Sequence, residues 1–379
     1  MIKKQSSIQF ILQRPLSDIK ANLIQTMNMC KGMANNNQKV SLILPICISA
    51  KEAESKLNSI IKNYENYFKI ILIPFDPKLK LFDEFDRFLV LKKHINFTSD
   101  YIFTRSSLIT IYCVLKKQKV IYEAHNSNFA KNKVLNKFFI YVFKKITRND
   151  VFKLFITISA NLNKFWITKG MPVSKTFAFH DGTSLVHQPN LIDVDIPFSN
   201  KNLLVTYTGS LYIDRGLDRI IKLAKEFNNL NFLVVGGPNE NAVKFREQCE
   251  LDFINNIFFT GPVAHSKVAS YLFKSDILLA LWSSKVPTIN YCSPLKVFEY
   301  MASNKLIVAD GFMTVKEVLT HKENAVLVEP DDYDSLQNAF KSILNDKDFY
   351  LSLGKKNCDL IKSTYNWERR SELILKNLI

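Results

Sequence analysis

The sequence has no long apolar run. Its longest uncharged apolar stretches, such as residues 40–50, fall well short of the ~18 residues that a membrane-spanning helix needs. The basic N-terminus is followed by an apolar run over residues 8–12 only, which is too short for a signal peptide. We therefore expect a soluble, cytoplasmic protein that at most attaches to the inner face of a membrane.

Metal-binding and dinucleotide-binding motifs are also missing. The six cysteines are scattered without C-x-x-C spacing, and the six histidines are equally dispersed. We therefore expect no metal site, and buried free thiols in a reducing compartment. The absence of G-x-G-x-x-G counts against a bound dinucleotide cofactor.

The chain does have size, apolar content and positive charge. With 379 residues, 47% of them apolar, it is long enough for two domains of about 150–200 residues. The net charge is +16, and residues 1–200 hold 29 Lys and Arg against 14 Asp and Glu, a net of +15. Positive charge confined to one half indicates an anionic partner, such as a membrane surface, a phosphorylated lipid or a nucleic acid.

Two other interpretations of this charge are weaker. An A/T-rich genome would also raise the lysine content, but it would do so in both halves of the chain. The basic residues are spread over many segments without a recognisable nucleic-acid-binding module, so we expect no nucleic-acid partner. An anionic membrane surface is the expected partner of the first half.

The second half alternates short β-branched or aromatic runs with amphipathic segments. Strands are predicted at residues 203–208, 231–235, 256–260, 277–281, 306–309 and 325–328. Helices are predicted at residues 217–227, 241–251, 266–274, 295–302, 315–320 and 335–344. Strands that alternate with helices through short links are typical of a doubly wound parallel sheet.

The first half follows a looser version of the same plan. A helix is predicted at residues 21–34, and residues 76–99 are too poorly patterned to assign. Strands are predicted at residues 8–12, 40–45, 70–74, 101–104, 119–124 and 154–159. The expected fold class is therefore α/β, with two doubly wound, Rossmann-like domains facing a cleft between the carboxyl ends of their sheets.

The domain boundaries are predicted from composition. Residues 183–202 mix Pro, Asn, Asp and Ser without periodicity, which is typical of a linker. We expect a basic N-terminal domain over residues 1–190 and a second domain over residues 191–365. A C-terminal helix over residues 366–379 is expected to pack against the N-terminal domain.

The first candidate site lies where the predicted strand 203–208 ends. Gly209 and Ser210 follow this strand, and Arg215 comes just before a helix that begins near Gly216. The backbone N–H groups at a helix start bind anions, and a guanidinium group matches phosphate oxygens. An ordinary strand-to-helix turn with Arg215 in solvent explains the pattern equally well.

The second candidate site is the start of the predicted helix 295–302. Ser293 is a suitable N-cap and Pro294 a suitable first helical residue. Lys296 in the first turn opposes the helix dipole, and an anion bound there would remove this penalty. Glu299 lies on the same side and could accept hydrogen bonds from a ribose. The alternative is a simple Lys296–Glu299 pair within the helix.

A third group of polar residues lies around the end of the predicted strand 119–124. Glu123, His125 and Asn126 are placed there, and Arg105 follows the preceding strand. Side chains at the carboxyl ends of parallel strands point towards the ligand site of a doubly wound sheet. A lone histidine is as often a structural residue, so both interpretations of His125 remain.

The order of these motifs resembles glycosyltransferase family 4, the retaining enzymes of the GT-B fold. In the first half the likeness is thin and rests on Glu123-Ala124-His125 and Ile156-Thr157-Ile158-Ser159. In the second half it covers essentially the full length and is carried by Tyr207-Thr208-Gly209-Ser210, Arg215-Gly216, Val234-Val235-Gly236-Gly237-Pro238, Phe259-Thr260-Gly261 and Ser293-Pro294-Leu295-Lys296-Val297-Phe298-Glu299-Tyr300-Met301-Ala302.

The resemblance implies a role for each matching residue. Arg215 and Lys296 correspond to the residues that bind the donor diphosphate, and Glu299 to the glutamate that holds the ribose. His125 corresponds to a histidine that contacts the donor sugar. The further donor-side candidates are Gly209, Ser210, Gly261, Pro294 and Leu295, and the acceptor-side candidates are Arg105, Glu123 and Asn126.

The resemblance also implies the chemistry. Retention in this family needs no protein nucleophile, because the donor phosphate helps to take the acceptor proton on the face that it leaves. No metal or cofactor is implied, and the nucleotide-sugar, UDP- or GDP-linked, is a substrate. The acceptor would be a glycan or a lipid-linked glycan of surface polysaccharide biosynthesis, with the N-terminal domain on the acceptor side.

The chain departs from the family pattern at a few positions. Ser210 stands where many members have arginine, and Tyr291 stands where many have a second glutamate. The glycine-rich loop of many relatives is also absent near Arg14. Two alternative functions therefore remain: a nucleotide-sugar epimerase of the same fold, or a catalytically silent nucleotide-sugar-binding scaffold.

Overall fold

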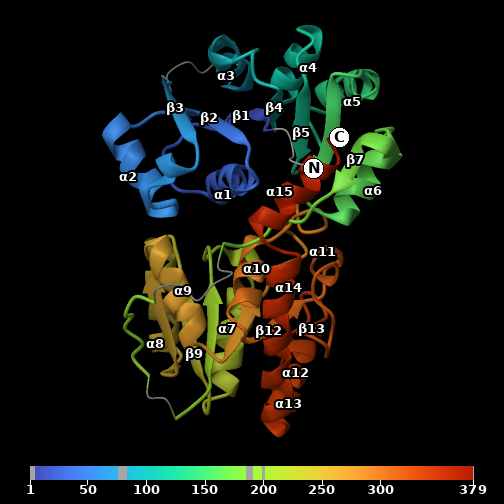
Figure 1. The fold of residues 1–379 in the computed structure, drawn as a ribbon. Coiled ribbons are helices and arrows are strands. Elements are labelled where there is room, and N and C mark those ends of the chain that lie inside the picture. The colour runs from blue at the N-terminus through green and yellow to red at the C-terminus, as the bar shows by residue number, and fades with distance from the viewer. Residues whose placement is uncertain (1–4, 76–82, 185–190, 199–200, 379) are drawn as a thin grey trace. The chain divides into compact units, whose positions relative to one another are not determined.

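The structure is a computed structural model, and it describes residues 5–75, 83–184, 191–198 and 201–378. The chain forms two compact units (Figure 1). The first unit comprises Met1–Asp181 together with Trp367–Ile379, and the second comprises Gly182–Asn366. The last segment of the chain thus belongs to the first unit.

The first unit is built on a seven-stranded parallel sheet. In spatial order its strands are β3 (Lys69–Pro74), β2 (Lys39–Ile46), β1 (Ser7–Ile11), β4 (Tyr101–Thr104), β5 (Val120–Ala124), β6 (Phe152–Thr157) and β7 (Thr176–Ala178). Its helices are α1 (Ala21–Asn35), α2 (Ala50–Ile60), α3 (Asp83–Leu91), α4 (Ser107–Leu115), α5 (Lys133–Ile146), α6 (Ala160–Thr168) and α15 (Trp367–Lys376), with short 3-10 turns η1 (Tyr64–Asn66), η2 (Lys92–His94) and η3 (Val173–Lys175). Because parallel strands are joined by right-handed crossovers, α1 and α2 cover one face and α3, α4 and α5 the other. Helix α15 packs against α1.

The second unit is built on a six-stranded parallel sheet. In spatial order its strands are β10 (Ile257–Gly261), β9 (Asn231–Val235), β8 (Leu204–Thr208), β11 (Ile277–Ala280), β12 (Leu306–Asp310) and β13 (Val326–Val328). Its helices are α7 (Leu217–Glu226), α8 (Asn239–Leu251), α9 (His265–Lys274), α10 (Leu295–Ala302), α11 (Met313–Lys316), α12 (Tyr333–Asn345), α13 (Lys347–Leu353) and α14 (Asn357–Ser363), with short turns η4 (Ile213–Arg215) and η5 (Gly354–Lys356).

Both faces of the second sheet are buried. Val205 and Leu279 point to the face that packs against α7, α8 and α12. Leu278 and Ile307 point to the opposite face, which packs against α10, α11 and α14. Successive side chains of a strand alternate between faces, so a strand that is covered on both sides is apolar throughout. This explains the continuous apolar runs in the second half.

The predicted fold class is confirmed, because both units are doubly wound parallel-sheet domains. The predicted strands of the second half agree with β8 to β13 to within one residue at each end. The predicted helix 315–320 is wrong: α11 is a single turn over Met313–Lys316. The chain then turns at Thr320, whose backbone N–H donates to Oδ1 of Asn324 over 2.7 Å.

Several elements of the first unit escaped prediction. Strand β7 is only three residues long, and α4 is apolar along most of its length, which hides the helical period. Residues 76–82, and residues 185–190 and 199–200 of the predicted linker, lie outside the described residues. In the parts of the chain that are described, no helix is long and apolar enough to cross a membrane.

Candidate active site

The strand order of the second sheet reverses between β8 and β11. From β8 the chain proceeds through β9 to β10, and it then crosses back to β11 and continues through β12 to β13. Doubly wound sheets bind ligands where the strand order reverses in this way, outside the carboxyl ends of the strands. Gly209 follows β8, and α10 begins after the loop that leaves β11.

Two glycines allow the backbone segments after β8 and β9 to approach each other closely at this point. Gly209 has φ of 139° and Gly236 has φ of 144°, a region that residues with side chains rarely adopt. A Cβ on Gly236 would lie 1.8 Å from the carbonyl oxygen of Gly209. A Cβ on Gly209 would lie 2.9 Å from Nζ of Lys296. The Lys296 ammonium therefore lies directly against the backbone that follows β8.

Replacing Gly236 by alanine is expected to lower the free energy of unfolding by about 2–3 kcal/mol, because the new methyl group meets backbone rather than a flexible side chain. Gly170→Ala is the matched control. Gly170 also has a positive φ, but its Cβ would meet only the side chain of Lys144, so we expect about 1 kcal/mol. Urea denaturation measures the loss of stability in both variants. Equal losses would contradict the close contact at Gly236.

The ammonium group of Lys296 is held in a confined place. Its Nζ lies 4.1 Å from the ring centre of Tyr207 and 5.4 Å from that of Trp282. Burial, and then the nearby charge of Arg215, lower the pKa of Lys296 to about 7, while Glu299 acts in the opposite direction. A protonated Lys296 is thus short of negative charge, which a bound anion would supply.

Arg215 also lacks a full set of partners. Its Nε is buried and has no hydrogen-bond partner within the described residues, and the nearest carboxylate oxygen, Oδ1 of Asp214, is 3.6 Å away. Buried polar groups in folded proteins are nearly always hydrogen-bonded, so this N–H group is available to donate to a ligand. Arg215 and Lys296 together form a cationic cluster at the end of β8.

The start of α10 adds backbone donors to this cluster. Pro294 occupies the N-cap position with φ of −75° and ψ of 109°, and its side chain makes no capping hydrogen bond. The predictions that Ser293 is the N-cap and that Pro294 is the first helical residue are therefore wrong by one residue. The N–H of Val297 donates to the carbonyl of Pro294, and the N–H groups of Leu295 and Lys296 come before the first full turn. Such donors attract anions.

Glu299 and Gly261 lie around the same site. The side chain of Glu299 is half-buried, and burial raises its pKa although the charges of His265 and Lys296 act against this shift. Gly261 accepts a hydrogen bond from the N–H of Gly236 over 3.2 Å. The structure thus brings together the predicted donor-side residues, with Ser210 held by Tyr207, whose Oη donates to the Ser210 carbonyl.

A buried ion pair supports the loop after β11. Both terminal nitrogens of Arg219 donate to the carboxylate of Asp310, over 2.8 and 2.7 Å. The same carboxylate accepts from the N–H of Trp282, and the carbonyl of Trp282 accepts from Arg219. This ion pair fixes the loop that contains Trp282, whose ring lies beside the ammonium group of Lys296. The pair was not predicted from the sequence, although Asp310 directly follows a predicted strand.

The polar residues of the first unit form a second cluster around one carboxylate. Glu123 is fully buried and accepts from Arg370, Arg105 and Gln25. Burial alone would raise its pKa, but the charges of Arg370, Arg105 and His125 hold it well below the usual value. Arg370 comes from α15, so the last helix of the chain completes a cluster that begins on β5.

His125 is oriented by this carboxylate. Its Nε2 lies 2.6 Å from Oε1 of Glu123, and burial followed by the charge of Arg105 lowers its pKa. A neutral imidazole that donates through Nε2 leaves Nδ1 as an acceptor. Asn126 differs from its neighbours: its side chain is exposed, while its backbone carbonyl accepts from Nε1 of Trp166.

Comparisons with known proteins agree with this fold. Residues 191–366 match the family model of glycosyl transferases group 1. The chain is 23% identical over 363 residues to an uncharacterized glycosyltransferase of Methanocaldococcus jannaschii, covering 88% of both chains. It is 22% identical over 260 residues to an uncharacterized glycosyltransferase of Haemophilus influenzae, covering 67% of this chain and 68% of that protein.

Solved structures share this fold. Sucrose-phosphate synthase from Thermosynechococcus elongatus superposes with a TM-score of 0.72 at 16% identity over 98% of both chains. Anabaena HepE, solved with UDP and glucose, superposes with a TM-score of 0.72 at 13% identity over 99% of both chains. The fold is therefore that of the GT-B glycosyltransferases, and the match over the second unit supports a glycosyltransferase of this type.

Proposed function

We propose that the protein is a retaining glycosyltransferase of family 4. It transfers a sugar from a nucleoside-diphosphate donor to a glycan or lipid-linked glycan in surface polysaccharide biosynthesis. The observation that carries this proposal is the cationic cluster at the reversal point of the second sheet. Burial and the charge of Arg215 lower the pKa of Lys296, Nε of Arg215 makes no hydrogen bond within the described residues, and Lys296 lies in the first turn of α10.

The cluster suits the leaving group of such a reaction. The bond between the anomeric carbon and the donor phosphate breaks as the acceptor hydroxyl attacks on the same face, and the acceptor proton passes to a phosphate oxygen. Negative charge grows on the departing diphosphate, where Lys296, Arg215 and the N–H groups of α10 stabilise it. Because these cations supply the charge, we propose transfer without a metal or a cofactor.

The other residues have supporting roles in this proposal. Glu299 accepts hydrogen bonds from the ribose hydroxyls, and the backbone at Gly261 lies against the base. His125, held by Glu123, contacts the donor sugar. The basic first unit works at the anionic inner face of the cytoplasmic membrane, where a lipid-linked acceptor would be found.

A thermal-shift screen with UDP, GDP, CDP and their sugars tests the donor part, since a ligand of the native state raises the melting temperature. The UDP bound in Anabaena HepE makes UDP-sugars the first to try. Nucleotide-sugars without effect at millimolar concentration would overturn the proposal. Conversion of the donor without any acceptor would instead identify an epimerase, and binding without turnover a scaffold.

The affinity for a nucleoside diphosphate is expected to fall as the pH rises from 7 to 9. The free protein holds Lys296 with a pKa of about 7, and a bound diphosphate raises this pKa because it favours the charged form. Binding above pH 7 therefore takes up a proton, and the affinity falls by at most about tenfold per pH unit. Calorimetry in buffers with different ionisation enthalpies measures this uptake.

Lys296→Ala is the control for this pH dependence, because it removes the titrating group. We expect its weaker binding to be nearly constant from pH 7 to 9, where the diphosphate is already ionised. Proton release on binding by the unsubstituted protein would contradict the proposed contact.

A further inference from the structure

The outward face of α5 is apolar. Four of its side chains are exposed over between 46% and 77% of their surface, namely Val134, Leu135, Phe138 and Tyr141. Phe139 and Phe143 on the opposite face are buried in the first unit. A surface helix normally turns polar residues outward, so α5 has an additional apolar stripe that the fold does not use.

The stripe is continuous along the helix. Val134, Phe138 and Tyr141 are spaced by four and three residues, which places their side chains in one row. The helix is fixed at its start, because Oδ1 of Asn132 accepts from the N–H groups of Val134 and Leu135 over 2.9 and 3.0 Å. The row is therefore a preformed ridge rather than a frayed end.

The charge beside this ridge has a single sign. Between residues 124 and 149 the sequence has no Asp or Glu, and it has six basic residues: Lys131, Lys133, Lys137, Lys144, Lys145 and Arg148. Lys133, Lys137 and Lys144 follow one another at intervals of four and seven residues, so they line one flank of the ridge, and Arg148 follows the end of the helix. Lys145 lies over the ring of Tyr141, 4.7 Å from its centre.

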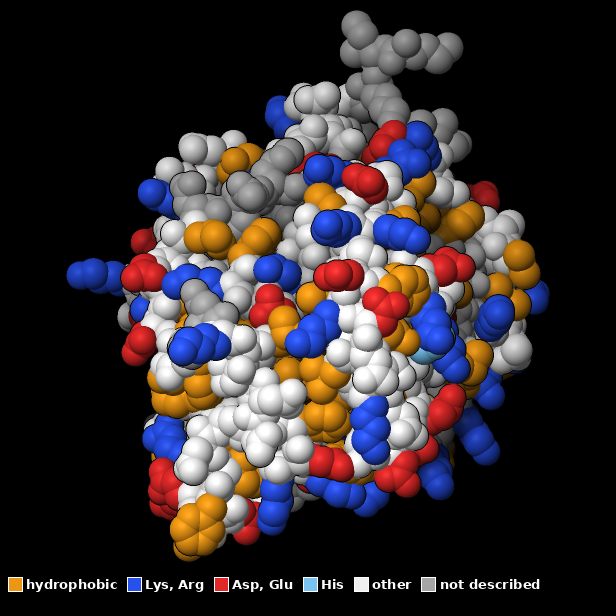
Figure 2. Space-filling view, turned by 90° about the horizontal axis from the view of Figure 1, so that it is seen from below, with side chains coloured by type: hydrophobic (Ala, Val, Ile, Leu, Met, Phe, Trp, Pro, Cys, Tyr) orange, Lys and Arg blue, Asp and Glu red, His pale blue; other side chains and the backbone are white. Residues whose placement is uncertain are grey.

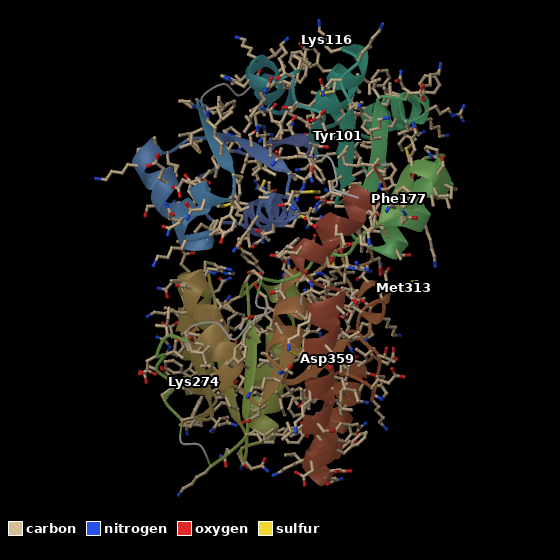
Figure 3. All side chains as sticks on the ribbon, in the orientation of Figure 1. Tyr101, Lys116, Phe177, Lys274, Met313 and Asp359 are labelled. Carbon is tan, nitrogen blue, oxygen red and sulfur yellow. The ribbon has the colours of Figure 1, made fainter. Side chains whose placement is uncertain are left out.

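The neighbouring helix continues this character. Helix α4 contacts α5. It ends at Leu115, which is highly exposed, and is followed by Lys116, an exposed residue labelled in Figure 3, and by Lys117. By contrast, Lys and Arg side chains are interspersed with Asp and Glu over the face shown in Figure 2.

We infer that the outward face of α5 is a docking surface for an anionic lipid bilayer. Its apolar side chains enter the boundary between headgroups and acyl chains, and its lysines meet the lipid phosphates. A second copy of this chain fits less well, because a two-fold contact through α5 would bring the same lysines together. This inference rests on the membrane attachment in the proposed function, but it does not require sugar transfer.

Vesicle flotation tests the inference on the full-length protein. We expect binding to phosphatidylcholine vesicles that contain phosphatidylglycerol, weaker binding as salt is added, and little binding to phosphatidylcholine alone. The variant Val134→Ser/Phe138→Ser/Tyr141→Ser should bind about tenfold more weakly or worse, with an unchanged melting temperature because these side chains are exposed. A second variant, Lys133→Ser/Lys137→Ser/Lys144→Ser, should lose the preference for anionic lipid.

The matched control is Leu251→Ser/Phe253→Ser. These side chains of the second unit are 80% and 86% exposed but are flanked by Glu250 and Asp252. Vesicle binding should be unchanged in this variant. The inference would be overturned if the wild-type protein bound neither kind of vesicle. It would also be overturned if the Val134→Ser/Phe138→Ser/Tyr141→Ser variant bound like the wild type.

The remaining outcomes separate the two proposals. A wild-type dimer that becomes monomeric in the triple serine variant, as seen by light scattering, would make α5 a self-association surface and overturn membrane docking. Loss of docking with intact donor binding and transfer would refute this inference alone. Vesicle binding without nucleotide binding would refute the transferase and leave the docking surface standing.

Discussion

Replacing Lys296 by alanine is expected to lower kcat for sugar transfer by about 10²- to 10³-fold without lowering the stability of the protein. The ammonium group lies against the backbone of Gly209, where the leaving diphosphate is proposed to develop charge. Burial lowers its pKa to about 7, so keeping this group charged in the free protein costs free energy. Its removal should leave the melting temperature unchanged or slightly higher, as is typical of functional groups in strained sites.

The measurement is steady-state transfer together with thermal denaturation of the same samples. Lys274→Ala is the matched control, because Lys274 is an exposed lysine of the second unit whose partner Asp193 is almost fully exposed. Such surface pairs contribute little, so this variant should retain both activity and stability. Arg215→Ala should resemble Lys296→Ala. Normal turnover in both of these variants would refute the assignment of the site.

Replacing Arg370 by methionine is expected to lower the free energy of unfolding of the first unit by about 4 kcal/mol. The substitution leaves the fully buried carboxylate of Glu123 without its shortest arginine contact, 2.9 Å in length. It also removes the Nε–H group that donates a hydrogen bond to the carbonyl of His180 over 2.9 Å. Arg105 still contacts Glu123, which keeps the loss from being larger.

Urea denaturation followed by tryptophan fluorescence measures this loss. In a Trp282→Phe background, the remaining tryptophans, Trp166 and Trp367, both belong to the first unit. Arg369→Met is the control. Arg369 forms an ion pair with Glu372 in which both side chains are partly exposed, so we expect a change within about 0.5 kcal/mol. Equal effects of the two substitutions would show that the buried cluster does not stabilise the unit.

The cluster around Glu123 should also make the stability of the first unit depend on pH. The pKa of Glu123 in the folded protein is depressed, so its pairing stabilises the fold fully above the ordinary carboxyl pKa of about 4.3. This stability is lost as the pH falls below that value. Arg370→Met should therefore lose less stability on acidification than the unsubstituted protein does.

Much of the second unit could be predicted from the sequence. Its strands are apolar on both faces, and its helices have one apolar face, so local pattern and tertiary burial agree. Gly209 and Arg215 were then selected from the loop between a predicted strand and the next helix, and Lys296 from the first turn of a predicted helix. The helix start at Ser293 was misplaced by one residue, because propensity alone does not decide which residue of a Ser-Pro pair begins the helix.

The first unit was harder to predict. Glu123 was selected from its strand, but its partners Gln25 and Arg370 come from segments far away in the sequence. Arg370 lies on the buried side of α15 with Trp367 and Ile374, a spacing that a helical pattern contains. Nothing local indicates which carboxylate such an arginine meets, because the pair is separated by 247 residues.

The sequence by itself determined the α/β class and the doubly wound plan, and it selected Arg215 and Lys296 as candidates for the donor site, because these depend on short-range periodicity and on the order of motifs. Only the tertiary structure decided that Lys296 packs against Gly209, that α15 completes the cluster at Glu123, and that α5 has an unused apolar face. These features depend on which segments lie next to one another after folding. A residue's neighbours set its burial and its pKa, and its position in the chain does not.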